Sequence, residues 1–66
     1  MAVAKTIEII SSSSTSFEDA VKQGVAKASE TVDGVQGAWV QDTEVAVSGN
    51  HISEWRVRMK ITFLVK

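Results

Sequence analysis

Hydrophobic and polar residues alternate most regularly in residues 52–65. One register is mostly apolar, with Ser53, Trp55, Val57, Met59, Ile61, Phe63 and Val65, and the other holds Ile52, Glu54, Arg56, Arg58, Lys60, Thr62 and Leu64. Successive side chains of a β-strand point to opposite faces of its sheet. The pattern therefore predicts a strand with one apolar face and one basic, polar face, and we expect it to be the central strand.

A helix is predicted before it, because apolar residues recur at helical spacing at Phe17, Ala20, Val21, Gly24, Val25, Ala28 and Val32. Thr15 with Glu18 has the spacing of a capping box, and Ser13 with Ser16 offers an earlier start. Asp33-Gly34 is a stop signal. Gly24 lies within the apolar stripe, which predicts that the helix approaches the sheet closely there.

Two further strands complete the predicted α+β fold. Ala2–Ile10 reads as the first strand, and Ser11–Ser14 as a loop. Val35–Val47 reads as the second strand, with a β-bulge near Gln41 and Asp42 because its apolar register changes parity. Ser48-Gly49-Asn50 is a hairpin loop. The order β-α-β-β predicts a three-stranded antiparallel sheet, with the last strand central and one helix on one face, in a single domain of residues 1–66.

The face of the sheet opposite the helix is expected to carry Gly37 and Trp39 beside Arg56, Arg58 and Lys60. A flat ring beside guanidinium groups is typical of a platform for a planar, anionic ligand. The same residue types are also enriched at ordinary subunit interfaces. Both interpretations require something to cover Trp39.

Composition favours association over isolation. The chain has 66 residues, no cysteine, no proline and one histidine. Disulfides are therefore excluded, a structural zinc site is disfavoured, and a lone small domain is marginal. A net charge of −1 suggests neither nucleic acid nor an anionic membrane as a partner. The first residues lack the pattern of a signal peptide, and no apolar run approaches the roughly 20 residues that cross a bilayer. We expect a cytoplasmic homo-oligomer.

Catalytic constellations are absent from the pattern. His51 falls in the predicted hairpin, and no base is placed beside the serine run. Asp42 and Glu44 flank Thr43, and a divalent cation is one use for such a carboxylate pair, with Glu54 as a further candidate ligand. Carboxylates at this spacing on a strand are more often simply solvated. The sequence thus favours a binding protein over an enzyme.

Almost the whole chain resembles the dodecin family. The resemblance rests on TIEIISSSSTSFEDAVKQGVAKASETVDGV, followed by AWVQD and WRVRMKITF. It implies a hollow dodecamer that holds riboflavin, FMN or FAD in stacked pairs between subunits, for storage without turnover.

The resemblance also implies changes at the ligand site. Flavin-binding members carry a stacking tryptophan where this chain has Gly37, and a ring-binding glutamine where it has Arg56. The acid that follows is retained as Asp42. A subgroup without that tryptophan is implied to bind calcium, for which Asp42, Glu44 and Glu54 are the candidates here. Trp39, two residues after Gly37, offers an alternative stacking ring on the same face, so the flavin and calcium alternatives both stand.

Overall fold

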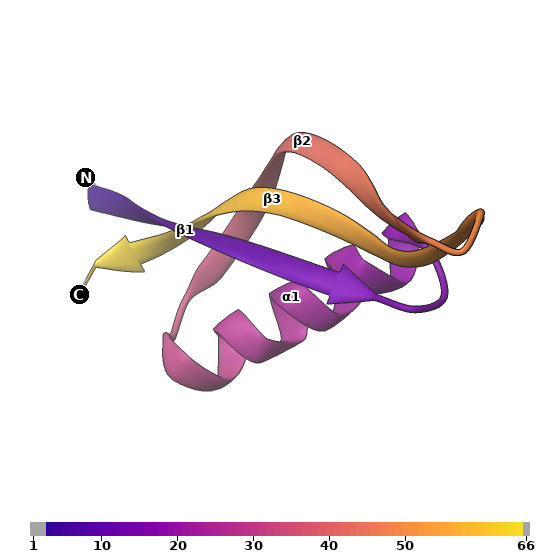
Figure 1. Cartoon of the computed structure of the whole chain (residues 1–66). Helices are drawn as coiled ribbons and strands as arrows, with labels where there is room; N and C mark the ends of the chain where they lie inside the picture. The colour runs from indigo at the N-terminus through magenta and orange to yellow at the C-terminus, as the bar shows by residue number, and fades with distance from the viewer. Residues whose placement is uncertain (1–2, 66) are drawn as a thin grey trace.

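The computed structural model describes residues 3–65, and its elements follow the predicted order. They are β1 (Val3–Ser13), α1 (Phe17–Thr31), β2 (Val35–Ser48) and β3 (His51–Val65). The strands form one antiparallel sheet in the order β1-β3-β2, and α1 lies across one face of it (Figure 1). The predicted topology and the central place of the last strand are confirmed. Ala2, assigned to the first strand, lies outside the described residues.

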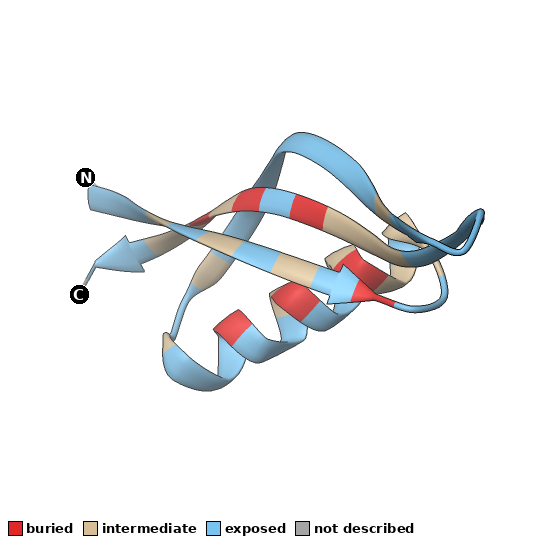
Figure 2. Ribbon diagram, in the orientation of Figure 1, coloured by how far each residue is buried: buried red, intermediate tan, exposed pale blue. Residues whose placement is uncertain are grey.

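The core sits between α1 and the apolar register of β3. Val57, Met59 and Ile61 are fully buried, and Ala20 and Ala28 of α1 pack on the same side (Figure 2). Because these positions alternate with exposed or half-exposed residues along β3, burial follows the period of the strand. From here on, the helix-facing side of the sheet is called the inner face and the opposite side the outer face.

The helix starts at a different cap from the two that the sequence suggested. Ser16 is the N-cap, and its Oγ accepts a hydrogen bond from the N–H of Asp19 at 3.0 Å. Ser13 instead supports the preceding turn: its Oγ accepts from the N–H of Thr15 at 2.9 Å and donates to Asp19 Oδ2 at 2.6 Å. At the other end, Val32 is extended and lies just outside the helix, so the apolar stripe was extended one residue too far.

The prediction of a loop over Ser11–Ser14 was wrong for its first three residues. Ser11, Ser12 and Ser13 continue β1 and pair with Val57, Arg56 and Trp55 of β3. The hydroxyl of Ser11 does not compete with the strand ladder, because it donates to the carbonyl of Ala20 in α1 at 2.7 Å. Serine is therefore tolerated in this strand where a helix carbonyl can accept a hydrogen bond from its hydroxyl.

Gly24 marks the point where α1 comes closest to the sheet. A Cβ atom at this position would collide with the terminal methyl of Met59 and lie 3.0 Å from Ser11 Cβ. The predicted close approach is confirmed. The cost of glycine in a helix, about 1 kcal/mol relative to alanine, is thus offset by contact with the buried strand.

The β2–β3 hairpin contains the predicted bulge and two further irregularities. Between Val40 and Asp42 an extra residue, Gln41, shifts the register, as expected. A second shift lies at the start of β2, and a third, at Ser53, brings Ile52 opposite Val47. Ile52 therefore pairs with an apolar residue, although strict alternation assigned it to the polar register.

The turn of this hairpin is shorter than predicted. Only Gly49 and Asn50 leave the strands, with φ of 55° and 65°. Two positive φ values are what a type I′ turn requires, and asparagine and glycine adopt them readily. His51 and Ser48 consequently face each other as the last pair of the ladder.

The inner face is only partly covered. The molecule measures 51 by 19 by 14 Å, and α1 lies mainly against β1 and β3. Val40, Val45 and Val47 of β2 remain exposed as a result. Within residues 3–65, no helix combines the length and hydrophobicity needed to span a bilayer.

Candidate functional site

The outer face is organised in rows that run across the three strands. Trp39 lies opposite Lys60, which in turn lies opposite Glu8 of β1. The next row runs from Asp42 through Arg58 to Ile10. The row after that runs from Glu44 through Arg56 to Ser12, and Gly37 lies opposite Thr62 on the other side of Trp39. All the residues that the sequence nominated for ligand or metal binding are therefore on this one face.

Trp39 is the largest apolar group of the outer face, and 65% of it is exposed. Two residues away, a Cβ at Gly37 would have no atom within 4 Å, so space is open along the strand beside the indole. The Lys60 ammonium lies 5.7 Å from the centroid of the Trp39 ring. A cation–π contact at an exposed site contributes about 0.5–1 kcal/mol. The ring is therefore held loosely and is accessible.

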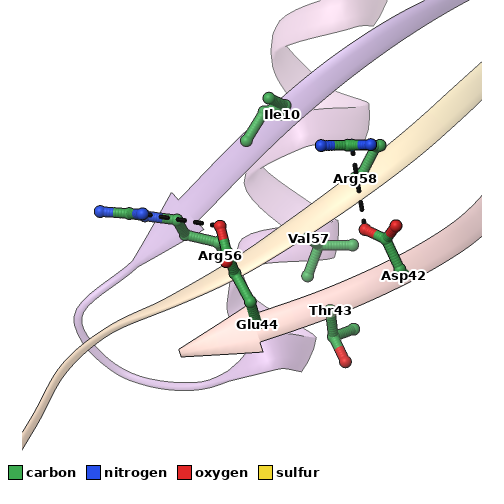
Figure 3. A pocket seen from close by; sticks show the side chains of 7 residues that line it. All are labelled: Ile10, Asp42, Thr43, Glu44, Arg56, Val57 and Arg58. Atoms are coloured by element: carbon green, nitrogen blue, oxygen red, sulfur yellow. Dashed lines mark ion pairs between the residues drawn. The ribbon is translucent and has the colours of Figure 1, made fainter. Parts of the chain in front are cut away.

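Three carboxylates of this face, those of Asp42, Glu44 and Glu54, are paired with arginines. Arg58 Nε lies 3.9 Å from Asp42 Oδ1, and Arg56 Nη1 lies 3.6 Å from Glu44 Oε1 (Figure 3). Arg56 Nε also donates a hydrogen bond to Glu54 Oε2 at 3.0 Å. The hydrogen bond and charge of Glu54, followed by the charge of Glu44, raise the pKa of Arg56 above its ordinary value despite some desolvation. Arg56 is thus a permanent cation held between two acids.

A shallow hollow of about 290 Å³ lies over these pairs, lined by Ile10, Asp42, Thr43, Glu44, Arg56, Val57 and Arg58. Figure 3 shows Asp42 and Glu44 rising from β2 toward the arginines, while Thr43 points away from them. Small-molecule pockets usually enclose roughly 300–1,000 Å³. The hollow is open and lies at the lower limit of that range, so it does not enclose a ligand within one chain.

The acidic side chains of residues 3–65 do not gather into a cluster within one chain. Calcium takes six to eight oxygen ligands. Among residues 3–65 there is no group of three or more histidine, aspartate or glutamate side chains placed to hold a metal ion. Asp42, Glu44 and Glu54 each face a guanidinium group instead. The metal assignment of Asp42, Glu44 and Glu54 stays a prediction.

A planar ring fits the face better. The face carries an exposed indole with open space beside it at Gly37, which is suited to stacking. Its arginine and lysine side chains are suited to pairing with a carbonyl or a phosphate. Arg56 occupies the position at which the resemblance implies a glutamine, and its donors are already shared with Glu44 and Glu54. The flavin assignment of Gly37, Trp39, Asp42 and Arg56 also stays a prediction.

One residue that lines the hollow, Ile10, was not among the site residues predicted from the sequence. Ile10 is 66% exposed and lies opposite Arg58 on the outer face. Its place follows from the alternation of β1, because Glu8 is on the same face two residues earlier. The predicted strand ended at Ile10, so the alternation was not followed to the outward side chain of this last residue.

Comparison with known proteins places the chain in a family. A family model described as Dodecin matches residues 3–66. The calcium dodecin of Mycobacterium tuberculosis is 32% identical over 66 residues, covering 100% of this chain and 93% of that protein. The chain belongs to the dodecin family.

Solved structures share the fold. A dodecin from Streptomyces davaonensis superposes with a TM-score of 0.95 at 22% identity, covering 98% of this chain and 96% of that one. The crystal structure of the M. tuberculosis calcium dodecin, described as having a novel calcium-binding site, gives a TM-score of 0.85 at 31% identity, with 97% and 91% covered.

Proposed function

We propose that this chain, as one domain of residues 1–66, assembles into a hollow homododecamer. In this proposal it sequesters a flavin (riboflavin, FMN or FAD) between subunits and does not turn it over. Membership of the dodecin family supports the assembly and the class of ligand. The observation that carries the proposal is the exposed Trp39 ring beside the open position at Gly37.

The shape of the outer face supports binding between subunits. One chain offers the ring, the cations and one wall of a hollow, and a second outer face laid against it would enclose a flat molecule. Aromatic rings pack favourably in offset-stacked pairs, and a flat gap between two outer faces accommodates that arrangement. Trp39 then replaces, from the neighbouring outward position, the ring that is missing at Gly37.

The test is a flavin titration of the purified oligomer. We expect the protein to quench the fluorescence of added riboflavin or FMN, and Trp39→Ala to abolish most of the quenching because the stacking surface is gone. Trp55→Phe is the matched control, since Trp55 is on the inner register of β3 and is expected to leave binding intact. A colourless protein that leaves both flavins unquenched contradicts the proposal.

Calcium is the second candidate, favoured by the relative described as a calcium dodecin and by three carboxylates on one face. Under this alternative, Asp42, Glu44 and Glu54 of neighbouring copies supply the oxygens. Thermal melts with calcium and with a chelator test it. We expect a higher melting temperature with calcium in the native chain and no difference in Asp42→Asn. Equal melting temperatures of the native chain under both conditions count against it.

A further inference from the structure

The cations of the outer face are not equivalent. Arg58 is paired with Asp42, and Arg56 is shared between Glu44 and Glu54. Lys60 is different: within residues 3–65, no carboxylate lies within 4.0 Å of its ammonium, although Glu8 is its neighbour across the β1–β3 ladder. Its charge is directed to the face of Trp39, at 5.7 Å.

Lys60 is also placed where a ligand stacked on Trp39 would meet it. The two residues are opposite each other in the β2–β3 ladder, and Lys60 is half-buried while Trp39 is exposed. A ring that stacks on the covered side of the indole displaces the ammonium. The displaced group remains on a flexible four-carbon stem with three donors, and it stays within reach of the edge of the ring.

A phosphate on such a ligand would compensate Lys60 for the loss of its contact with the indole. A neutral ligand removes the cation–π contact of Lys60 and offers the ammonium no charged partner in return. A phosphate ester carries about −1.5 to −2 charges at neutral pH and accepts charge-assisted hydrogen bonds, which are stronger than a cation–π contact at an exposed site. Arg58 and Arg56, the preceding residues of the outer register of β3, keep their carboxylate partners, so Lys60 is the cation free to change partner.

We propose that Lys60 makes the Trp39 site selective for planar ligands that carry a phosphate over their uncharged counterparts. The inference rests on the proposed function, since it concerns the ligand of the same site. In the free protein the ammonium lies over one face of the indole, and in the complex it pairs with the phosphate. Lys60 is therefore a specificity-determining residue.

The test compares FMN with riboflavin, which share one ring system and differ in the phosphate. Both are titrated against the native protein, Lys60→Met and Lys60→Arg at low salt, after the mass of each variant shows that assembly is unchanged. A hydrogen bond to a charged group corresponds to about a tenfold change in affinity or more. We expect the native protein to prefer FMN by about tenfold, Lys60→Met to lose this preference with riboflavin affinity unchanged or slightly improved, and Lys60→Arg to retain it.

Lys22→Met is the matched control, because it removes one positive charge from the exposed face of α1, where Lys22 pairs with Glu18. It is expected to leave the FMN preference as in the native protein. A ratio of affinities that is the same in the native protein and in Lys60→Met overturns the inference while flavin binding stands. Absence of binding of either flavin to the native protein overturns the proposed function and the inference with it. If Lys22→Met also loses the preference for FMN, the preference follows the net charge of the protein, and the assigned role of Lys60 is overturned.

Discussion

The inner and outer faces of the sheet are built from alternate residues of the same central strand, yet different interactions hold them. On the inner face, Val57, Met59 and Ile61 are fully buried beneath α1. On the outer face, Arg56, Arg58 and Lys60 pair with acids or with Trp39 in contact with solvent. The comparison teaches that the buried apolar contacts lie on one side of β3 and the groups of the proposed ligand site on the other.

The difference should be largest between neighbours in sequence that point to opposite faces. We expect Met59→Ala to lower the free energy of unfolding by about 2–5 kcal/mol, because a buried side chain is replaced by a cavity. Arg58→Ala, its neighbour on the outer face, should lower it far less, since it opens no cavity in the core and its ion pair with Asp42 is long, at 3.9 Å. Urea unfolding at a fixed protein concentration measures both. Equal losses would show that the two faces do not divide stability in this way.

Two glycines provide a second comparison of intermediate size. Gly24→Val should cost about 1–3 kcal/mol, because the new side chain overlaps Met59 and Ser11 in a packed region. Gly37→Ala should be tolerated, since nothing lies within 4 Å of the added Cβ. Thermal melts of the two variants beside the native protein check this. A Gly24→Val protein as stable as the native chain would contradict the close approach of α1 to the sheet.

Two serines that are adjacent in β1 should give the smallest difference. Ser11→Ala removes the hydrogen bond from Ser11 Oγ to the carbonyl of Ala20 and is expected to cost about 0.5–1.5 kcal/mol. Ser12→Ala, on the exposed outer face, should change stability by less than about 0.5 kcal/mol. Denaturant midpoints resolve such values if the slopes are equal. A larger loss of stability in Ser12→Ala than in Ser11→Ala would contradict the assignment of Ser11 to the inner face and Ser12 to the outer face.

Much of this arrangement follows from periodicity. The alternation of β3 identified the buried residues, the apolar stripe of α1 identified the covering element, and the change of parity in β2 predicted the bulge at Gln41. These features were predictable because burial forces a strict choice of side-chain type at each position. Gly24 was predictable for the same reason, since glycine in an apolar stripe has no other advantage there.

The errors arose where one contact from a distant element decides the local structure. The hydroxyl of Ser11 in β1 donates a hydrogen bond to the carbonyl of Ala20, and no local pattern shows that carbonyl. Ile52 changes side through a bulge at Ser53, in a part of the hairpin where exposure weakens the pattern. On the outer face, the sequence identified the residues but not their pairing, because carboxylates and arginines follow no fixed spacing across strands.

The central claim is that other copies of the chain complete the outer face. Sedimentation of the protein in dilute buffer at physiological salt measures the mass of the species that forms. We predict a single species close to twelve times the 7.1 kDa of one chain, and emission shielded from a soluble quencher in a Trp55→Phe variant, where Trp39 is the remaining indole. A folded species of 7.1 kDa whose Trp39 is fully quenched would contradict it.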